Sequence, residues 1–223
     1  MSTNRPRFED LLEQLQSCLL EMAGEAEGLL ELALNALLQR DMAALSKVKE
    51  GDQVVDALEL EVDERAMELL ALQQPLAGDL RQILATLKIS NDLERVGDHA
   101  VKIANASRRV VEHPPISDLP QMEEMAGQAR GMLSDALRAW SRRDPELARQ
   151  VRLRDDVVDA LRTRCHRILI SHMMEDPRRL TPALELIHVS QSLERVADLA
   201  TNIAEETVFL VEGEVIRHGP ETA

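Results

Sequence analysis

Aromatic side chains are almost absent from this chain of 223 residues, which contains two Phe, one Trp and no Tyr. The protein interior must therefore be filled by Leu, Val, Ile, Met and Ala, as is usual in helix bundles. Leu, Ala, Glu and Arg dominate the sequence, and all four are good helix formers. The scarcity of aromatics excludes a core built on large rings and favours an all-α fold.

Cysteine and long apolar runs are also scarce. Cys18 and Cys165 stand in apolar stretches without the spacing of a metal site, which predicts two buried free thiols in a reducing compartment. No apolar run reaches the roughly 18 residues that a membrane span needs. The polar start, residues 1–7, is unlike a signal peptide. These features predict a soluble, cytoplasmic protein.

Positive charge is in short supply, because the formal net charge is −14. Phosphate backbones are bound by an excess of Lys and Arg, so this balance argues against a nucleic-acid partner. It is compatible with cations or with basic surfaces on other proteins. The sequence also contains no Gly-rich phosphate loop, Ser-His-Asp set or dinucleotide fingerprint. We therefore expect a binding protein and not an enzyme.

The most prominent feature of the sequence is a repeated motif. The stretch 93–100 returns as 193–200, with Leu, Glu, Arg, Val, Asp and Ala retained at an offset of 100 positions. Residues 52–58 return as 155–161 at an offset of 103. Recurrences of this length indicate a duplicated structural unit.

Each unit has the apolar periodicity of long helices. In the first unit, Asp41 is a candidate cap for the second helix, and Pro75 suits the first turn of the third. The fold class expected is all-α, with six long antiparallel helices in two tandem three-helix bundles. The predicted boundaries are a first bundle over 8–111, a Pro-rich linker over 112–120, a second bundle over 121–211 and a polar tail over 212–223, with residues 1–7 frayed.

Carboxylates form rows on the helices of the first unit. Glu94 and Asp98 lie about 40° apart on one helical face. Asp52 and Asp56 begin a second row, which continues through Glu59 and Asp63. If the second and third helices are neighbours, four carboxylates share a surface groove, and oxygen donors of this kind suit hard cations.

A plainer interpretation competes with metal binding. In so acidic a chain about seven carboxylate pairs at spacing four arise by chance, and most acidic helix faces are simply solvated. Both pairs reappear in the second unit, although the duplication itself would copy them. A metal-binding protein and a metal-free helical adaptor or scaffold therefore both remain open on spacing alone.

The motifs resemble the signature of the PhoU family, in Gln74-Pro75, Asp79-Leu80-Arg81 and the stretch from Asn91 to Asp98. This resemblance implies a negative regulator of phosphate uptake and of phosphate-starvation signalling, built from two three-helix bundles. It implies multinuclear metal clusters, with Fe, Mn, Zn or Mg as candidate ions. It also implies a phosphate ABC transporter ATPase and a phosphate-sensing histidine kinase as partners, a homodimer, and contact with membranes only through those partners. Carried over by motif, the metal ligands are Asp52, Asp56, Glu94 and Asp98 in one site and Asp155, Asp159, Glu194 and Asp198 in the other.

The second site departs from the first. Arg162 and His166 stand where the first row has Glu59 and Asp63, so we expect weaker metal binding or fewer ions there. His166 is either a further ligand or a solvent-facing residue. Arg95 and Arg195 either form local salt bridges or contact phosphate or a phosphorylated partner.

Three further features carry weaker hypotheses. Glu185 and His188 have the spacing of ferritin-like di-iron helices, but that architecture needs a second such motif, which the chain does not contain. An Arg-rich stretch is either a solvated face paired with Asp155, Asp156 and Asp159 or a docking surface for an acidic partner; it comprises Arg149, Arg152, Arg154, Arg162, Arg164 and Arg167. Close helix packing is expected at the glycines inside helices, which are Gly24, Gly28, Gly97, Gly127 and Gly131.

Overall fold

The computed structural model describes residues 5–73, 77–116, 119–214 and 216. The described part contains helices and no strand. The helices are α1 (Arg5–Gln39), α2 (Met42–Gln73), α3 (Ala77–Val111), α4 (Pro120–Arg142), α5 (Pro145–Arg152), α6 (Asp155–Glu175), the 3₁₀ helix η1 (Pro177–Arg179) and α7 (Leu180–Glu212).

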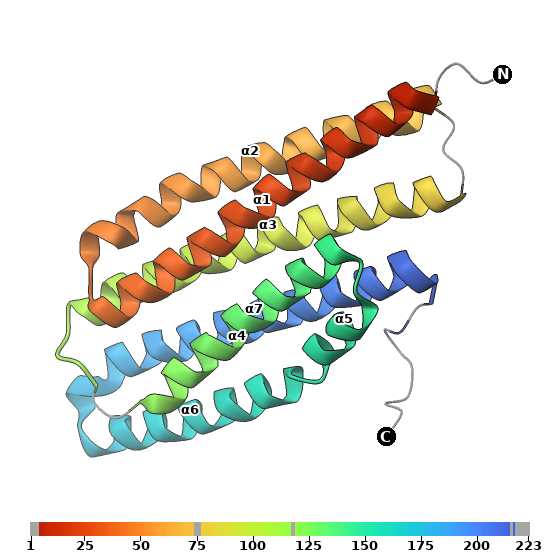
Figure 1. The fold of residues 1–223 in the computed structure, drawn as a ribbon. Coiled ribbons are helices and arrows are strands. Elements are labelled where there is room, and N and C mark those ends of the chain that lie inside the picture. The colour runs from red at the N-terminus through yellow and green to blue at the C-terminus, as the bar shows by residue number, and fades with distance from the viewer. Residues whose placement is uncertain (1–4, 74–76, 117–118, 215, 217–223) are drawn as a thin grey trace.

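These helices form two tandem bundles, as the sequence predicts. Helices α1 to α3 pack together in the first, and α4 to α7 form the second (Figure 1). Helix α1 begins at Arg5, three residues before the predicted start. Glu212 belongs to α7, although we predicted it as the first residue of the polar tail. Pro75 and most of that tail lie outside the described residues.

One long helix of the second bundle is broken, which the sequence did not predict. Leu153 and Arg154 separate α5 from α6, and no glycine or proline marks the break. Arg154 turns its side chain onto α4, where Nη1 lies 2.7 Å from Asp135 Oδ2 and Nε lies 3.3 Å from Gln128 Oε1. The break is therefore held by contacts between helices and not by a local sequence signal.

The predicted helix starts are capped by aspartates. The Asp41 carboxylate accepts hydrogen bonds from the backbone N–H groups of Ala43 and Ala44, at 2.9 and 3.1 Å. Asp144 does the same at the start of α5, just before Pro145. Such caps satisfy backbone donors that the first helical turn leaves unpaired.

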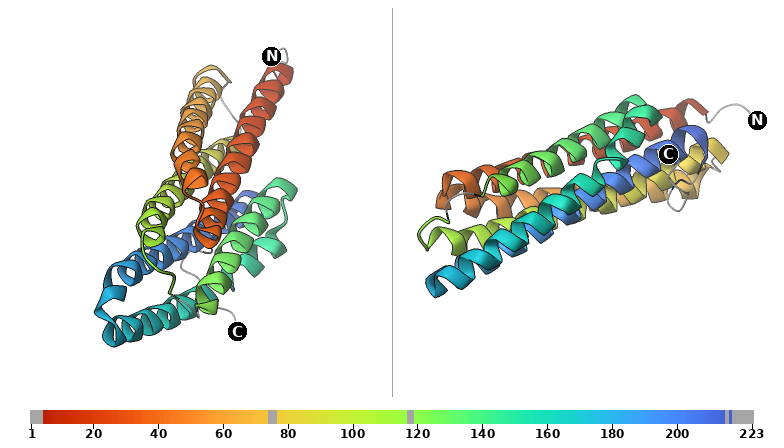
Figure 2. Two further views of the ribbon diagram at one scale, coloured as in Figure 1. Left: turned by 90° about the vertical axis from the view of Figure 1, so that its left-hand side faces the viewer. Right: turned by 90° about the horizontal axis from the view of Figure 1, so that it is seen from below.

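Helices α3 and α7 run antiparallel along the centre of the molecule and join the two bundles (Figures 1 and 2). Lys88 of α3 contacts Glu206 of α7 at 3.1 Å, and Arg109 contacts Glu185 at 2.7 Å. In each pair, the residue of α3 is as far along the chain from Gly97 as the residue of α7 is from Ala197, in the opposite direction. Gly97 and Ala197 are equivalent positions of the repeat. The two central helices are thus related by an approximate twofold axis.

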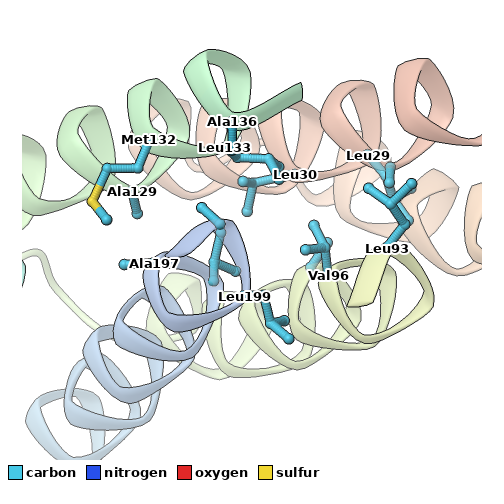
Figure 3. Close-up of a cluster of buried hydrophobic side chains, with 14 of the residues drawn as sticks. Leu29, Leu30, Leu93, Val96, Ala129, Met132, Leu133, Ala136, Ala197 and Leu199 are labelled. Atoms are coloured by element: carbon cyan, nitrogen blue, oxygen red, sulfur yellow. The ribbon is translucent and has the colours of Figure 1, made fainter. Parts of the chain in front are cut away.

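One continuous aliphatic core fills both bundles. Leu30 of α1, Val96 of α3, Leu133 of α4 and Leu199 of α7 converge where the bundles meet (Figure 3), and all four are buried. Cys18 and Cys165 are buried free thiols, as predicted. None of the described helices combines the length and apolar character needed to cross a membrane.

Candidate metal centre

The first carboxylate cluster comprises Asp52 and Asp56 of α2 and Glu94 and Asp98 of α3. Helices α2 and α3 pack against each other. Burial raises the pKa of Asp52, and the charges of Asp56 and Asp98 raise it further. Burial also raises the pKa of Glu94, with added repulsion from Asp98, Glu59, Asp56 and Asp52. The fold therefore brings all four predicted residues within electrostatic reach of one another.

Gly97 leaves the space in which one of these carboxylates sits. A Cβ atom at this position would lie 2.8 Å from Asp52 Oδ1 and 3.5 Å from Val55 Cγ1. A side chain there would push against the Asp52 carboxylate. The expected packing role of this glycine therefore has a specific cause, which is the close approach of α2 to α3.

Little positive charge compensates this cluster. Lys102 Nζ lies 3.3 Å from Asp98 Oδ2, one helical turn further along α3. Within the described chain, Asp52, Asp56 and Glu94 form no ion pair. Sequence reasoning overlooked Lys102, although its spacing of four from Asp98 is the ordinary signal of a helical ion pair.

The acidic row continues along α2 as predicted. Burial raises the pKa of Glu59, and the charges of Asp63 and Asp56 add to the effect. A hydrogen bond with Asn91 of α3 acts in the opposite direction. The first cluster therefore extends toward Glu59.

The second cluster comprises Asp155 and Asp159 of α6 and Glu194 and Asp198 of α7. Burial, together with the charges of Asp198 and Asp159, raises the pKa of Asp155 to about 6. The Thr201 hydroxyl donates a hydrogen bond of 3.5 Å to Asp155 Oδ1. Thr201 was missed from the sequence because its distance from Asp155 along the chain gives no local signal.

Arginines neutralise part of the second cluster. Arg162 Nε lies 3.8 Å from both Asp159 Oδ1 and Glu194 Oε1. Arg195 Nη1 lies 2.8 Å from Asp198 Oδ2, and its Nε lies 4.0 Å from Glu194 Oε2. Arg162 therefore neutralises part of the charge of the carboxylate row, as we expected from its position. Arg195 forms a local salt bridge, which was one of the two interpretations offered for it.

His166 does not face solvent freely. It is half-buried, and its Nε2 lies 2.9 Å from the Ser190 hydroxyl. Burial lowers its pKa, and the charge of Arg162 adds to this effect. The solvent-facing interpretation of this histidine is therefore wrong, whereas its role as a further metal ligand stays a prediction.

The two clusters differ as cation sites. Their donors are all carboxylates, which hard cations prefer. In the first cluster mutual repulsion is relieved by a single lysine, whereas in the second the arginines already supply positive charge. As the side chains stand in the described residues, no three His, Cys, Asp or Glu groups converge closely enough to hold one metal ion.

Other sequence candidates find different partners. The Glu185 carboxylate accepts a hydrogen bond from Arg109 Nη2 at 2.7 Å and lies 3.4 Å from His188 Nδ1. Its pKa is lowered mainly by Arg109. Glu185 is thus paired with an arginine of α3 and does not point into a bundle core as a di-iron ligand would.

The Arg-rich stretch pairs largely within the molecule, and mostly with residues other than the aspartates we named. Arg149 contacts Glu212 and Glu146, Arg152 contacts Glu205, and Arg154 contacts Asp135. Of the expected pairs, that of Arg162 with Asp159 is formed. These arginines attach α5 and its neighbours to α4 and α7, so their main visible role is structural.

The prediction of close helix packing at the glycines is confirmed for only some of them. A Cβ at Gly131 would lie 2.8 Å from Arg154 Nη2. At Gly24, Gly28 and Gly127 an added Cβ would meet nothing within 4 Å. The expectation was therefore wrong for these three positions, which face open space.

Comparison with known sequences gives a consistent result. The sequence model of the PhoU domain family matches residues 19–107 and again residues 122–207. The chain is 36% identical over 207 residues to the phosphate-specific transport system accessory protein PhoU homolog of Xylella fastidiosa strain Temecula1, covering 93% of this chain and 86% of that protein. It is 37% identical over 216 residues to the homolog of the same name from Pseudomonas aeruginosa, covering 95% and 88%.

Solved structures agree in fold. The crystal structure of PhoU from Pseudomonas aeruginosa matches with a TM-score of 0.90 at 36% identity, over 93% of this chain and 100% of that chain. The phosphate transport system regulatory protein PhoU from Streptococcus pneumoniae matches with a TM-score of 0.86 at 26% identity, over 94% and 99%.

Proposed function

Since this chain belongs to the PhoU family, we propose that it is a regulatory accessory of phosphate transport that binds metal ions through its carboxylate clusters. In this proposal it restrains phosphate uptake and the phosphate-starvation response when phosphate is plentiful. Its partners are the ATPase of a phosphate ABC transporter and a phosphate-sensing histidine kinase, which it meets in the cytoplasm. It acts by binding and not by catalysis, and it works as a homodimer.

The observation that supports metal binding most directly is the state of the first cluster. Asp52 and Asp56 come from α2, and Glu94 and Asp98 come from α3. Burial and the neighbouring carboxylates raise the pKa of Asp52 and of Glu94, and among the described residues Lys102 is the one ion-pair partner of the four. Holding uncompensated carboxylates together costs free energy that a cation would recover. A bound metal would supply positive charge that ties α2 to α3, with small rotations of the carboxylates to complete its coordination.

The two clusters are expected to differ in affinity. Arg162 and Arg195 would have to leave carboxylates of the second cluster before a cation could use them. The first cluster requires at most the release of Lys102, which is exposed. We therefore propose that metal fills the first cluster before the second.

Metal analysis tests this proposal. Purified protein is dialysed against Mn²⁺, Fe²⁺, Zn²⁺ or Mg²⁺, and its metal content is compared with that of an Asp56→Ala, Asp98→Ala double variant. A Glu64→Ala, Glu68→Ala variant is the matched control, since it also removes two carboxylates, and these exposed residues of α2 lie outside the cluster. We expect loss of metal only in the first variant. Equal metal content in all three proteins would reject the assigned site, and no bound metal in any of them would favour a metal-free adaptor.

The regulatory role has its own test. In a strain that lacks the gene, we expect phosphate-starvation genes to be active in rich phosphate, and the intact gene to restore repression. Normal repression in the deletion strain would reject the regulatory proposal, whatever the metal content of the protein. Light scattering of the purified protein tests the homodimer separately.

A further inference from the structure

Two grooves run along the contact between α3 and α7, one on either side of the approximate twofold axis. The larger, about 930 Å³, is lined among others by Asp92, Asp155, Asp198 and Glu205, and we call it the acidic groove. The smaller, about 590 Å³, is lined by His99, Lys102, Asn105, Ala106, Arg109, His188, Gln191, Ser192 and Arg195, and we call it the basic groove. No carboxylate is among the residues that line the basic groove.

Because the two units are repeats, the residues that line one groove can be compared with their equivalents in the other. Positions that line the acidic groove have equivalents, 100 residues away, that line the basic groove. Asp92 is replaced by Ser192, and Glu205 by Asn105. Asn202 is replaced by Lys102, and Leu199 by His99. The acidic groove is also lined by Lys88, Arg95 and Arg195, and Arg195 lines both grooves. Carboxylates, however, line only the acidic groove.

The basic groove concentrates hydrogen-bond donors suited to an oxyanion. Arg109 and Arg195 carry guanidinium groups, Lys102 carries an ammonium group, and all three are exposed. Asn105, Gln191 and Ser192 add amide and hydroxyl donors. Groups of these kinds bind phosphate oxygens, and arginine does so through paired N–H groups. The lining of this groove contains no carboxylate, although the net charge of the chain is −14.

Carboxylates outside the groove hold its cations in place. Arg109 is bonded to Glu185 at 2.7 Å, Arg195 to Asp198 at 2.8 Å and Lys102 to Asp98 at 3.3 Å. An arginine has five N–H donors, so one carboxylate leaves others available for a ligand. Fixing the two arginine side chains beforehand also reduces the entropy that binding would cost.

His99 also lines the basic groove but offers it no free donor. Its Nδ1 atom has no hydrogen-bond partner within the described residues, yet it is buried and therefore out of reach of a ligand in the groove. From the donors and the absence of lining carboxylates, we propose that the basic groove binds a small oxyanion of the phosphate class.

Titration calorimetry with inorganic phosphate tests this site. The protein is first freed of metal and dialysed in 150 mM chloride, so the result does not depend on the metal proposal. We expect saturable binding of phosphate, about tenfold weaker binding in Arg195→Gln and in Arg109→Gln, and little heat from added chloride. The expected loss follows from the strength of charge-assisted hydrogen bonds.

Matched variants test whether phosphate binds in the basic groove or is attracted by positive charge in general. Arg95→Gln changes the equivalent residue of the repeat, which lines the acidic groove, and Arg108→Gln changes an exposed neighbour of Arg109 outside both grooves. Both should bind phosphate like the unchanged protein. Circular dichroism of each variant excludes loss of fold as the cause of weaker binding. Equal affinity in Arg195→Gln and Arg95→Gln, or no saturable binding in the unchanged protein, would overturn the proposal.

Chemical modification tests where phosphate binds, and a second ligand tests whether the site takes the free ion or a phosphorylated side chain. Acylation of the Lys102 amine, followed by mass spectrometry, should slow in the presence of phosphate, while that of Lys49 on the exposed face of α2 should not. Repeating the titration with O-phosphoserine distinguishes a free ion from a phosphorylated side chain. Tighter binding of O-phosphoserine would assign the groove to a phosphorylated partner, and tighter binding of inorganic phosphate would assign it to the free ion. Unchanged acylation of Lys102 would contradict the site.

Discussion

At the residue scale, Gly97 is the position where the smallest change tests the first cluster. Gly97→Ala places a methyl group 2.8 Å from Asp52 Oδ1, so the carboxylate must move. Alanine is better than glycine in a helix by about 1 kcal/mol, which offsets the crowding. We expect little change in the free energy of unfolding but clearly weaker metal binding, measured by urea titration and by dialysis.

Gly24→Ala is the control for that prediction. A Cβ at Gly24 would meet nothing within 4 Å, so only the gain in helix propensity remains. Stability should rise by about 0.5 to 1 kcal/mol, with unchanged metal binding. If Gly97→Ala and Gly24→Ala bind metal equally well, the contact between Gly97 and Asp52 has no part in the site.

His99 makes stability depend on pH. Burial lowers its pKa to about 4, whereas an unfolded histidine titrates near 6.5. A lowered folded pKa contributes stability above pH 6.5 that is lost as pH falls from 6.5 through 4, because only the unfolded chain takes up the proton. We expect a loss of about 1 to 2 kcal/mol over this range that His99→Leu removes, since leucine stands at the equivalent position 199.

Urea titrations of metal-free protein between pH 7 and pH 4 measure this difference. The carboxylates Asp52 and Asp155 act with the opposite sign, because their raised pKa favours the folded state at low pH. Subtracting the variant from the unchanged protein isolates the histidine. A variant whose pH profile parallels that of the unchanged protein would contradict the buried, neutral state of His99.

At the scale of elements, the break between α5 and α6 depends on one side chain. Arg154→Ala removes the bonds to Asp135 and Gln128 that attach the break to α4. These charged, half-buried bonds should be worth about 1 to 3 kcal/mol together. We expect unfolding at lower urea, whereas Arg164→Ala, an exposed arginine of α6, should change stability by less than about 0.5 kcal/mol.

Element boundaries show where local sequence suffices. Asp41 was identified as a cap because the first helical turn needs acceptors near its own residues, and it forms the expected bonds. Asp144, at the equivalent place of the second unit, forms the same bonds. The break at Leu153 escaped prediction because its cause lies on α4. Arg149 and Arg152 were likewise assigned wrong partners, since their real ones lie on α7 or in the same short helix.

At the scale of the whole molecule, the first cluster and the basic groove share Lys102, which lines the groove and contacts Asp98. A cation bound by Asp98 would release Lys102 for an anion in the groove, so the two ligands should favour each other. We expect metal to tighten phosphate binding about three- to tenfold, and Lys102→Gln to abolish this difference. Calorimetry with and without Mn²⁺ provides the measurement, and equal phosphate affinity in both states would exclude the coupling.

The amino-acid sequence by itself determined the helical class, the two repeated bundles and the carboxylate rows, because helical periodicity and duplication are properties of residues close along the chain. Only the tertiary structure decided which charges meet. The arginines of the second cluster, the contact of Gly97 with Asp52 and the opposite character of the two grooves all depend on how α2, α3, α6 and α7 are placed. Electrostatic interactions act across space over a few ångströms, and spacing along a chain does not fix the distances between helices.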